Sequence, residues 1–306
     1  MSGRQGINKI EPLEIDPRLR RHELGFLELV NKPTKEELLS YYENNYYQNE
    51  SGSYRKSYSE LEQTVIGLRI AQRARQISFF RGEVPGSLLD VGCGEGFVLR
   101  HYAELGWSVT GLDFSLAGVE RMNPACIRYV EQGDVFGLLD EKIHANQNYD
   151  LVWLGNVLEH VLDPIALLNS LRKLVKRSGL LLVTVPNDGN FYHEYLYQSQ
   201  QIPERWWIAI PDHISYFTAD SLKRSVAKSG WDCLAIHGDF PIDWFLANEA
   251  ANFLTDRAKG SEAHQARLRL DFIIAQSGVD KANRFYECLA DIGLGRNITA
   301  YLRPAA

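Results

Sequence analysis

The sequence has 306 residues, of which 45% are hydrophobic, and a formal net charge of −6. This length allows one large domain, or a core domain with appended elements. Acidic and basic residues are interspersed without a basic stripe, which disfavours a nucleic-acid partner. The four cysteines lie far apart, so neither a zinc site nor a disulfide framework is expected. The N-terminus lacks the apolar segment of a signal peptide and no apolar run could span a bilayer, so we expect a cytoplasmic protein with no membrane partner and no metal.

Residues 1–80 are predicted to form an N-terminal helical extension and lid, and the first thirty are expected to lie against the surface of the main domain. A helix begins at a capping box made by Thr34 and Glu37, and residues 60–80 have the apolar spacing of a long helix. The tyrosine-rich stretch 46–54 between them has two interpretations of equal weight. It is a loop that folds over a cofactor, or an ordinary surface loop.

A short apolar strand at 88–91 is followed by three alternate glycines, Gly92, Gly94 and Gly96. Because glycine has no Cβ, the backbone there can lie close to an extended ligand. The helix predicted from position 97 would add free N–H groups. A dinucleotide fingerprint would need a third glycine at 97, where the sequence has Phe97. The stretch therefore indicates a nucleoside pocket of another kind.

Two carboxylates accompany these glycines. Asp113 ends a second predicted strand, where an open parallel sheet places an acidic side chain against ribose hydroxyls. Asp90 precedes the first glycine and could attract a cationic group, and S-adenosylmethionine (SAM) has both an ammonium and a sulfonium. The stretch 88–97 together with Asp113 resembles the first two motifs of the class I SAM-dependent methyltransferases. An unrelated glycine-rich turn is the alternative.

Later segments resemble further motifs of the same family. Asp134 follows a third strand predicted at 127–130, and the resemblance assigns it to the adenine amine, although it could instead be a turn residue. A fourth strand at 149–154 precedes Asn156-x-x-Glu159-His160. Asp163-Pro164 then opens a helix that ends near Gly179, before a fifth strand at 180–187. The resemblance covers about residues 86–240.

The resemblance implies an α/β fold: a Rossmann-like, seven-stranded, mostly parallel sheet with an antiparallel last strand. Residues 81–240 would form the SAM-binding core. S-adenosylmethionine would be the cofactor and S-adenosylhomocysteine the product. The side chains and backbone expected to hold the cofactor are those of Asp90, Gly92, Cys93, Gly94, Gly96, Phe97, Asp113, Phe114, Asp134, Val135, Asn156 and Glu159.

Two histidines are candidates for catalysis. Methyl transfer to a hydroxyl requires alignment of the oxygen and removal of its proton, and histidine titrates in the useful pH range. His160 follows the fourth strand. His213 follows Asp212, which could orient it, and the pattern Pro-x-His-x-x-x-Phe resembles small-molecule methyltransferases akin to those of quinone biosynthesis. The alternative for each histidine is a structural role, bonded to backbone.

The segment 188–210 is long and aromatic, which is typical of a functional loop. Its Tyr192 and Arg205 are candidate acceptor ligands, because aromatic rings stack on sugars or flat rings and arginine binds phosphate or carboxylate. Trp206 and Trp207 are either acceptor ligands or packing anchors, and we expect one of them to face the acceptor and the other the core.

The end of the chain departs from the family pattern. A sixth strand is predicted at 231–237 and a seventh at 296–302, and the family normally joins them in a hairpin. Here helices predicted at 240–254, 262–277 and 280–289 intervene. We expect the insertion 241–290 to lie beside the acceptor site as a lid or as a surface for a homodimer, with Arg267 offering positive charge. The final strand, within 291–306, returns to the core.

The predicted function is SAM-dependent methylation of a hydroxyl on a small molecule by a histidine base. The segment Gly-x-Gly-Arg-Asn-Ile at 293–298 resembles enzymes of surface-polysaccharide or activated-sugar metabolism, so the acceptor is expected to be a sugar, a sugar nucleotide or a glycan. One alternative is O-, N- or C-methylation of a phenolic or quinone-like compound. Another is a non-catalytic protein that binds SAM and acts as a partner.

Overall fold

The computed structural model describes residues 15–42 and 57–306. The tyrosine-rich stretch 46–54 lies outside the described residues. The strands are β1 (Leu19–Arg21), β2 (Leu27–Leu29), β3 (Ser87–Val91), β4 (Ser108–Asp113), β5 (Val130–Gln132), β6 (Tyr149–Gly155), β7 (Val175–Pro186), β8 (Ser215–Tyr216), β9 (Trp231–Gly238) and β10 (Asn297–Pro304). The α-helices are α1 (Lys35–Tyr42), α2 (Glu60–Arg81), α3 (Phe97–Glu104), α4 (Ala117–Met122), α5 (Val135–His144), α6 (Pro164–Arg172), α7 (Phe191–Gln198), α8 (Ala219–Lys228), α9 (Lys259–Gln276) and α10 (Val279–Asp291). Short 3-10 helices are η2 (Pro124–Tyr129), η3 (Leu158–His160), η4 (Ile242–Ala247) and η5 (Glu249–Ala251).

A seven-stranded sheet in the order β5-β4-β3-β6-β7-β10-β9 forms the centre of the molecule. Neighbouring strands in the part of the sheet ordered β5-β4-β3-β6-β7 are parallel. Strand β10 runs antiparallel to its two neighbours, β7 and β9. Leucines of β3, β6 and β7 are fully buried, as expected for strands covered on both faces. The predicted Rossmann-like sheet with an antiparallel last strand is therefore confirmed.

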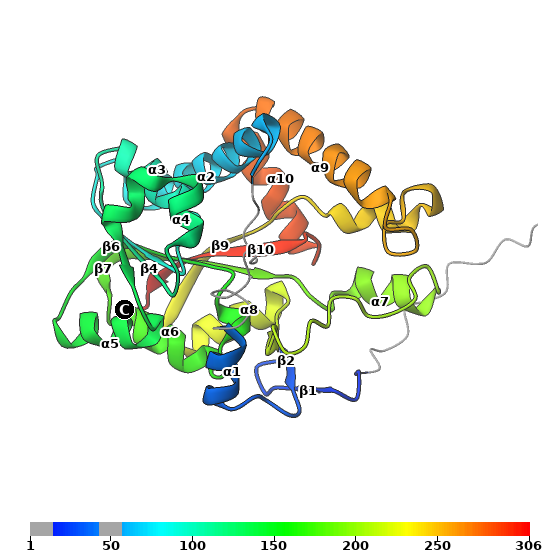
Figure 1. The fold of residues 1–306 in the computed structure, drawn as a ribbon, viewed down its shortest axis with the longest axis horizontal. Coiled ribbons are helices and arrows are strands. Elements are labelled where there is room, and N and C mark those ends of the chain that lie inside the picture. Colours follow the sequence, from blue (N-terminus) through cyan, green and yellow to red (C-terminus); the bar gives the residue numbers. More distant parts are fainter. Residues whose placement is uncertain (1–14, 43–56) are drawn as a thin grey trace, which may run out of the picture.

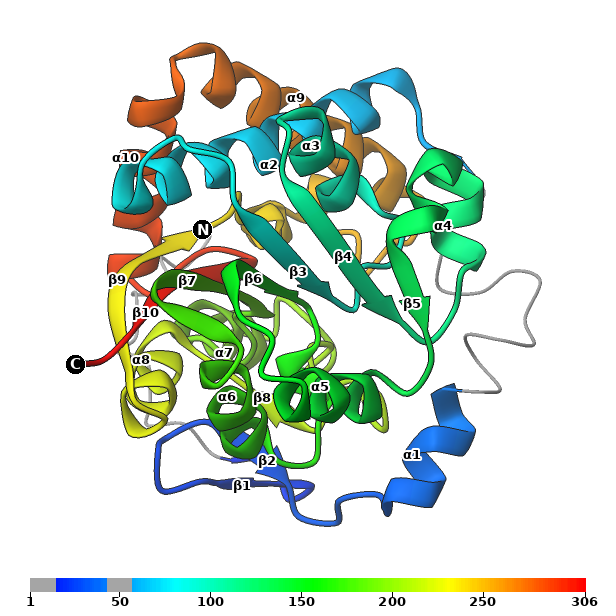
Figure 2. The same cartoon turned by 90° about the vertical axis from the view of Figure 1, so that its left-hand side faces the viewer.

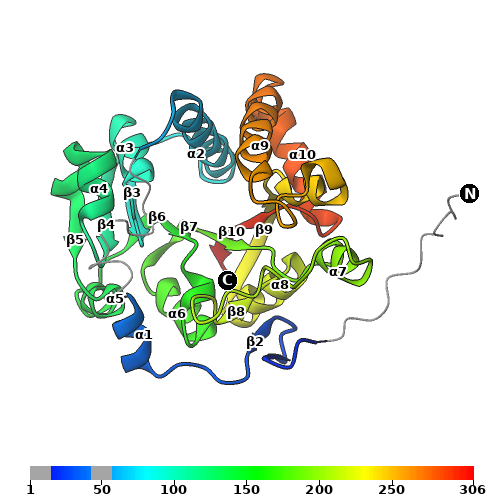
Figure 3. The same cartoon turned by 45° about the vertical axis from the view of Figure 1, so that its right-hand side comes forward.

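Helices cover both faces of this sheet (Figures 1 and 3). On one face lie α2, α3, α9 and α10, and on the other lie α5, α6 and α8. The predicted caps form where the sequence placed them. Thr34 and Glu37 make reciprocal hydrogen bonds at the start of α1, and the Asp163 side chain accepts a hydrogen bond from the Ala166 N–H at the start of α6.

Three predicted boundaries were wrong, each for a local reason. Residues 127–129 belong to η2, which Pro124 opens, so that the third strand of the core begins at Val130. Helix α6 ends at Arg172 instead of near Gly179, because β7 already begins at Val175. Gly179 instead lies in β7, where a Cβ would be 2.9 Å from the carbonyl oxygen of Tyr149. Residues 240–254 form η4 and η5, not one α-helix.

The N-terminal segment forms a second, three-stranded sheet in the order β1-β2-β8. Strand β8 follows His213 directly, and the Leu29 N–H donates to the Ile214 carbonyl over 3.0 Å. Residues 27–29 therefore pair with the segment that follows His213, where the sequence predicted only that the first thirty residues lie against the surface. Figure 2 shows β1 and β2 below α6.

The segment between β9 and β10 contains the predicted helical insertion. Helix α9 packs on α2, and α10 packs on both α2 and β9. The start of the insertion contacts a different helix. There, the Asp243 carboxylate of η4 lies 3.0 Å from His193 Nε2 of α7. Within residues 15–42 and 57–306, none of the helices combines the length and apolar character needed to cross a bilayer.

Candidate active site

The turn between β3 and α3 depends on its glycines. Gly92, Gly94 and Gly96 have φ values of 72°, 53° and 74°, which favour glycine. A Cβ on Gly92 would lie 2.7 Å from Val157 Cγ2, and one on Gly96 would lie 2.9 Å from Val119 Cγ2. The backbone therefore passes close to its neighbours at a point where only glycine fits.

Asp113 fixes this turn to the end of β4. Its Oδ2 accepts a hydrogen bond from the Gly94 N–H over 2.7 Å, and its Oδ1 accepts one from the Ser115 N–H over 3.0 Å. Each carboxylate oxygen has a second lone pair, so Asp113 keeps capacity to accept from ligand hydroxyls. The side chain is 7% exposed and borders a cavity.

Asp90 is a buried carboxyl beneath the same turn. Its burial, together with the nearby charge of Asp113, raises the pKa of Asp90 to about 8. A cationic ligand group beside it would oppose that shift, because it favours the ionised carboxylate. Asp90 does not border the cavity described below, so its predicted contact with the ammonium or sulfonium stays a prediction.

A cavity of about 420 Å³ opens beside the turn, within the range of ~300–1,000 Å³ usual for small-molecule sites. Of the predicted cofactor residues, those that line it are Gly92, Asp113, Phe114, Val135 and Asn156. Asn156 has a φ of 55°, which asparagine tolerates better than most residues. Lys35 and Leu38 of α1 and Val157 also line the cavity, and the sequence did not single them out.

The other predicted cofactor residues lie in or next to the turn, with two exceptions. The Asp134 side chain caps α5 by accepting from the Phe136 N–H over 3.2 Å, and it does not border the cavity, whereas the adjacent Val135 does. Glu159 is 1% exposed and lies beside the histidines. Cys93 is also buried, between β4 and α3.

The structure brings the two candidate histidines together. The rings of His160 and His213 lie edge to face with centroids 5.0 Å apart. A backbone hydrogen bond of 2.8 Å from the Ile214 N–H to the Glu159 carbonyl joins the two segments. His160 also lines the cavity. The two candidates are thus parts of one cluster, which borders the cavity through His160.

His160 has hydrogen-bond acceptors near both ring nitrogens. Its Nδ1 lies 2.8 Å from the Asp212 carbonyl and 3.3 Å from the Asp212 carboxylate, and its Nε2 lies 3.6 Å from Glu159 Oε1. Burial lowers the pKa of His160, but the Asp212 hydrogen bond and the charges of Glu159 and Asp212 outweigh it and raise the pKa to about 9. His160 therefore carries a proton at neutral pH.

Glu159, His160 and His213 each offer one ligand atom, and these atoms lie within 4.8 Å of one another. A metal ion would have to displace the proton from His160. The absence of a metal from this cluster stays a prediction.

His213 has a different carboxylate partner from the one that the sequence suggested. Asp212 contacts His160, whereas His213 Nδ1 lies 3.3 Å from Asp188 Oδ2. Asp188 Oδ1 in turn accepts from Arg296 Nη1 over 2.8 Å. The sequence analysis connected neither Asp188 nor Arg296 with His213. The available signal for Asp188 was its place at the carboxyl end of the fifth strand.

The predicted acceptor residues are spread out. Trp207 is 3% exposed and stacks on His193, so it faces the core. The ring of Trp206 lies 4.5 Å from the Arg296 guanidinium, close to Asp188. Arg205 pairs with Glu194, and the Tyr192 hydroxyl reaches the Trp244 carbonyl. Arg267 lies on α9 next to His264, at the contact with α2 and away from the cavity lining.

Residues 67–236 match the model of the methyltransferase domain. Ubiquinone biosynthesis O-methyltransferase from Colwellia psychrerythraea is 32% identical over 129 residues, which are 40% of this chain and 50% of that protein. The enzyme of the same name from Vibrio cholerae is 36% identical over 105 residues, 33% of this chain and 42% of that protein. The chain thus spans half or less of the length of these relatives. Among solved structures, a SAM-dependent methyltransferase from Archaeoglobus fulgidus matches 86% of this chain and 98% of its own, with 19% identity and a TM-score of 0.47.

Proposed function

This chain belongs to the methyltransferase domain family, and we propose that it transfers the methyl group of S-adenosylmethionine to a hydroxyl of a small molecule. The observation that carries the proposal is the glycine turn, tied to Asp113, that opens onto a cavity bordered by His160. The proposal is supported by the position of this turn and of a titratable histidine at the border of the same cavity.

The residues at the turn fit the methyl donor. Asp113 would accept hydrogen bonds from the ribose hydroxyls with its remaining lone pairs, and the backbone at Gly92 can approach the ligand because no side chain intervenes. Asp90 would be the counter-charge for a cationic group. Phe114 and Val135 provide apolar contact for a flat base. When bound, S-adenosylmethionine supplies an electrophilic methyl carbon and a neutral thioether leaving group.

The protein's own task is to align the acceptor oxygen and take its proton. The raised pKa of His160 makes its ring a poor base at neutral pH, and protein acceptors lie near both of its nitrogens. We infer that His213 is the base. The acceptor O–H proton passes to the imidazole of His213 as the oxygen–carbon bond forms and the carbon–sulfur bond breaks. The proton then leaves to solvent.

The acceptor is the open part of the proposal. An aromatic hydroxyl is favoured by the many apolar side chains around the cavity, among them Leu38, Leu139 and Val161, and by the names of the relatives. A sugar hydroxyl was the prediction from residues 293–298. That segment has structural contacts of its own: Gly295 lies against Gly238, Arg296 binds Asp188, and Asn297 binds Asp239. Its pattern therefore gives no added support for a sugar.

A lid or a homodimer surface remains our proposal for the helical insertion. The exposed apolar side chains of α9 and α10, such as Ile273 at 61% and Phe285 at 38%, support the dimer interpretation. Light scattering after size exclusion would report the mass in solution.

Two measurements test the function. Titration calorimetry with S-adenosylmethionine reports on the cofactor site, and absence of binding would overturn the proposal. Incubation with phenols, catechols and sugar nucleotides, with mass spectrometry of the products, reports on the acceptor. Cofactor binding without methylation of any acceptor would favour the non-catalytic alternative, and parallel reactions with EDTA would expose any need for a divalent metal.

A further inference from the structure

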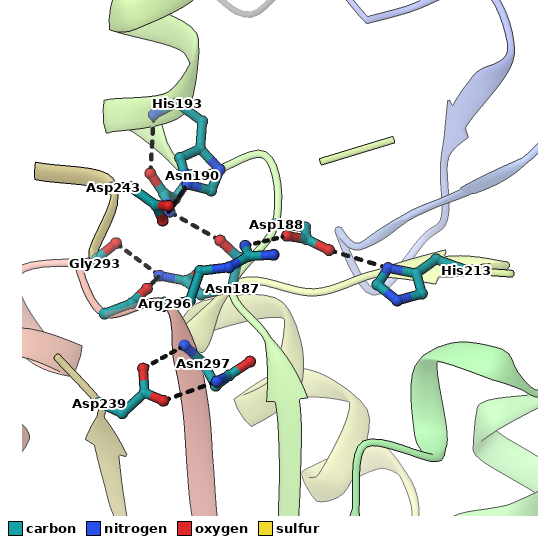
Figure 4. A network of polar contacts seen from close by, with 11 residues as sticks. Asn187, Asp188, Asn190, His193, His213, Asp239, Asp243, Gly293, Arg296 and Asn297 are labelled. Atoms are coloured by element: carbon teal, nitrogen blue, oxygen red, sulfur yellow. Dashed lines mark hydrogen bonds and ion pairs between the residues drawn. The ribbon is translucent and has the colours of Figure 1, made fainter. Parts of the chain in front are cut away.

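The side chain of Asp188 lies between Arg296 and His213 (Figure 4). We propose that Asp188, held by Arg296, is a positioning residue that keeps His213 in the tautomer with its proton on Nδ1 and so leaves the Nε2 lone pair free for the acceptor. This inference rests on the proposed function, because it assigns a role within the same site.

The geometry of Asp188 limits what it can do. It follows the end of β7, is 2% exposed, and directs one carboxylate oxygen to each partner: Oδ1 to Arg296 at 2.8 Å and Oδ2 to His213 Nδ1 at 3.3 Å. An ionised carboxylate only accepts hydrogen bonds. His213 Nδ1 must therefore be the donor, and a neutral ring then has its lone pair on Nε2.

Arg296 keeps Asp188 ionised and in place. Burial alone would raise the pKa of Asp188, but the charge of Arg296 and the hydrogen bonds from His213 and Arg296 outweigh it, so that this pKa is lowered. The Arg296 guanidinium also lies over the ring of Trp206. The backbone carbonyl of Arg296 accepts a hydrogen bond from the Asn187 N–H over 3.0 Å. The arginine is thus fixed by contacts on several sides.

The surroundings of His213 contain other titratable groups. The His160 ring centroid lies 5.0 Å from that of His213, ligand atoms of Glu159, His160 and His213 lie within 4.8 Å of one another, and Asp212 is bound to His160. His160 has acceptors at both nitrogens, whereas Asp188 binds His213 through one nitrogen. The two histidines therefore differ in the one property that a base requires, an available lone pair.

The first test does not depend on activity. In long-range proton–nitrogen NMR of the wild-type protein, the signals of His213 at a pH where it is neutral should be those of the Nδ1–H tautomer. Asp188→Asn should weaken or lose this preference, because an amide can donate as well as accept. A wild-type His213 in the Nε2–H form would overturn the inference.

The second test uses a matched control, Asp239, which follows the end of β9 as Asp188 follows the end of β7. Asp239 binds the start of β10 through Asn297, with distances of 2.7 and 2.8 Å, but it does not contact a histidine (Figure 4). We expect Asp188→Asn to lower kcat on the order of 100-fold and to shift the acid limb of the pH–rate profile to lower pH. Asp239→Asn should leave both unchanged, and the affinity for S-adenosylmethionine should stay constant in each variant.

The outcomes separate this inference from the proposed function. If His213→Ala keeps full methylation, the base assignment fails. If His213→Ala is inactive but Asp188→Asn behaves like Asp239→Asn in both kcat and NMR, only the positioning role fails. Arg296→Lys adds a graded variant, since it keeps the charge but loses the planar fork, and an intermediate loss of kcat is expected. Thermal unfolding of all variants shows whether an inactive one is still folded.

Discussion

The glycine turn and the histidine cluster differ in how far apart their parts lie along the chain. The turn, its helix and Asp113 all come from residues 88–113 and are held by local backbone contacts. The surroundings of His213 come from segments just after β6 and β7 and just before β8 and β10. A local unit can be recognised from spacing, whereas an assembled one is specified by the fold.

The largest expected effect separates the two units in function. Replacement of His213 by alanine should lower kcat by roughly 100- to 10,000-fold, the usual contribution of a general base, while cofactor affinity stays unchanged. Steady-state kinetics and calorimetry measure the two quantities. His144→Ala, on the exposed end of α5, is the control. If kcat fell further in His160→Ala than in His213→Ala, His160 and not His213 would be the base.

The converse change breaks the local unit. Gly92→Val places a side chain at positive φ and 2.7 Å from Val157, so cofactor affinity should fall roughly 100-fold. Gly106→Val carries the same backbone strain, but no neighbour lies within 4 Å of its Cβ. Calorimetry should show normal binding for Gly106→Val. If both variants lost cofactor affinity equally, backbone strain and not proximity to the cavity would be the cause.

The protonation of His160 gives a pH-dependent test of the assembled unit. Its pKa is raised from 6.5 to about 9 on folding, so its contribution to stability is complete below pH 6.5 and is lost as the pH rises through 9. The free energy of unfolding should fall by about 3 kcal/mol across this interval. Urea denaturation between pH 6 and about 10 should show a shallower decline in His160→Gln, and parallel curves would contradict the raised pKa.

The smallest effect concerns a part outside both units. Ser59 caps α2 by accepting from the Glu62 N–H. Ser59→Ala should cost about 1 kcal/mol of stability without changing kcat, and Ser59→Thr should keep most of the cap. Denaturation curves and kinetics together provide the check. A fall in kcat here would show that the site depends on α2 more than its contacts indicate.

The sequence predicted the sheet, most helices and the cofactor turn because glycine spacing, capping residues and apolar strands are signals read over a few residues. It could not pair Asp188 with His213 or Asp212 with His160, since neighbours in sequence, such as Asp212 and His213, point to different partners in space. It also missed β1 and β2, which are three residues each and gain stability only by pairing with β8.

The pairing of β2 with β8 changes where this catalytic unit begins and ends. A fragment cut to the family match, residues 67–236, would keep the glycine turn, Asp188 and both histidines. It would lose the Leu29 contact that holds the His213 loop and the Arg296 guanidinium that holds Asp188. The smallest unit that contains the whole proposed site therefore includes residues on both sides of the matched segment.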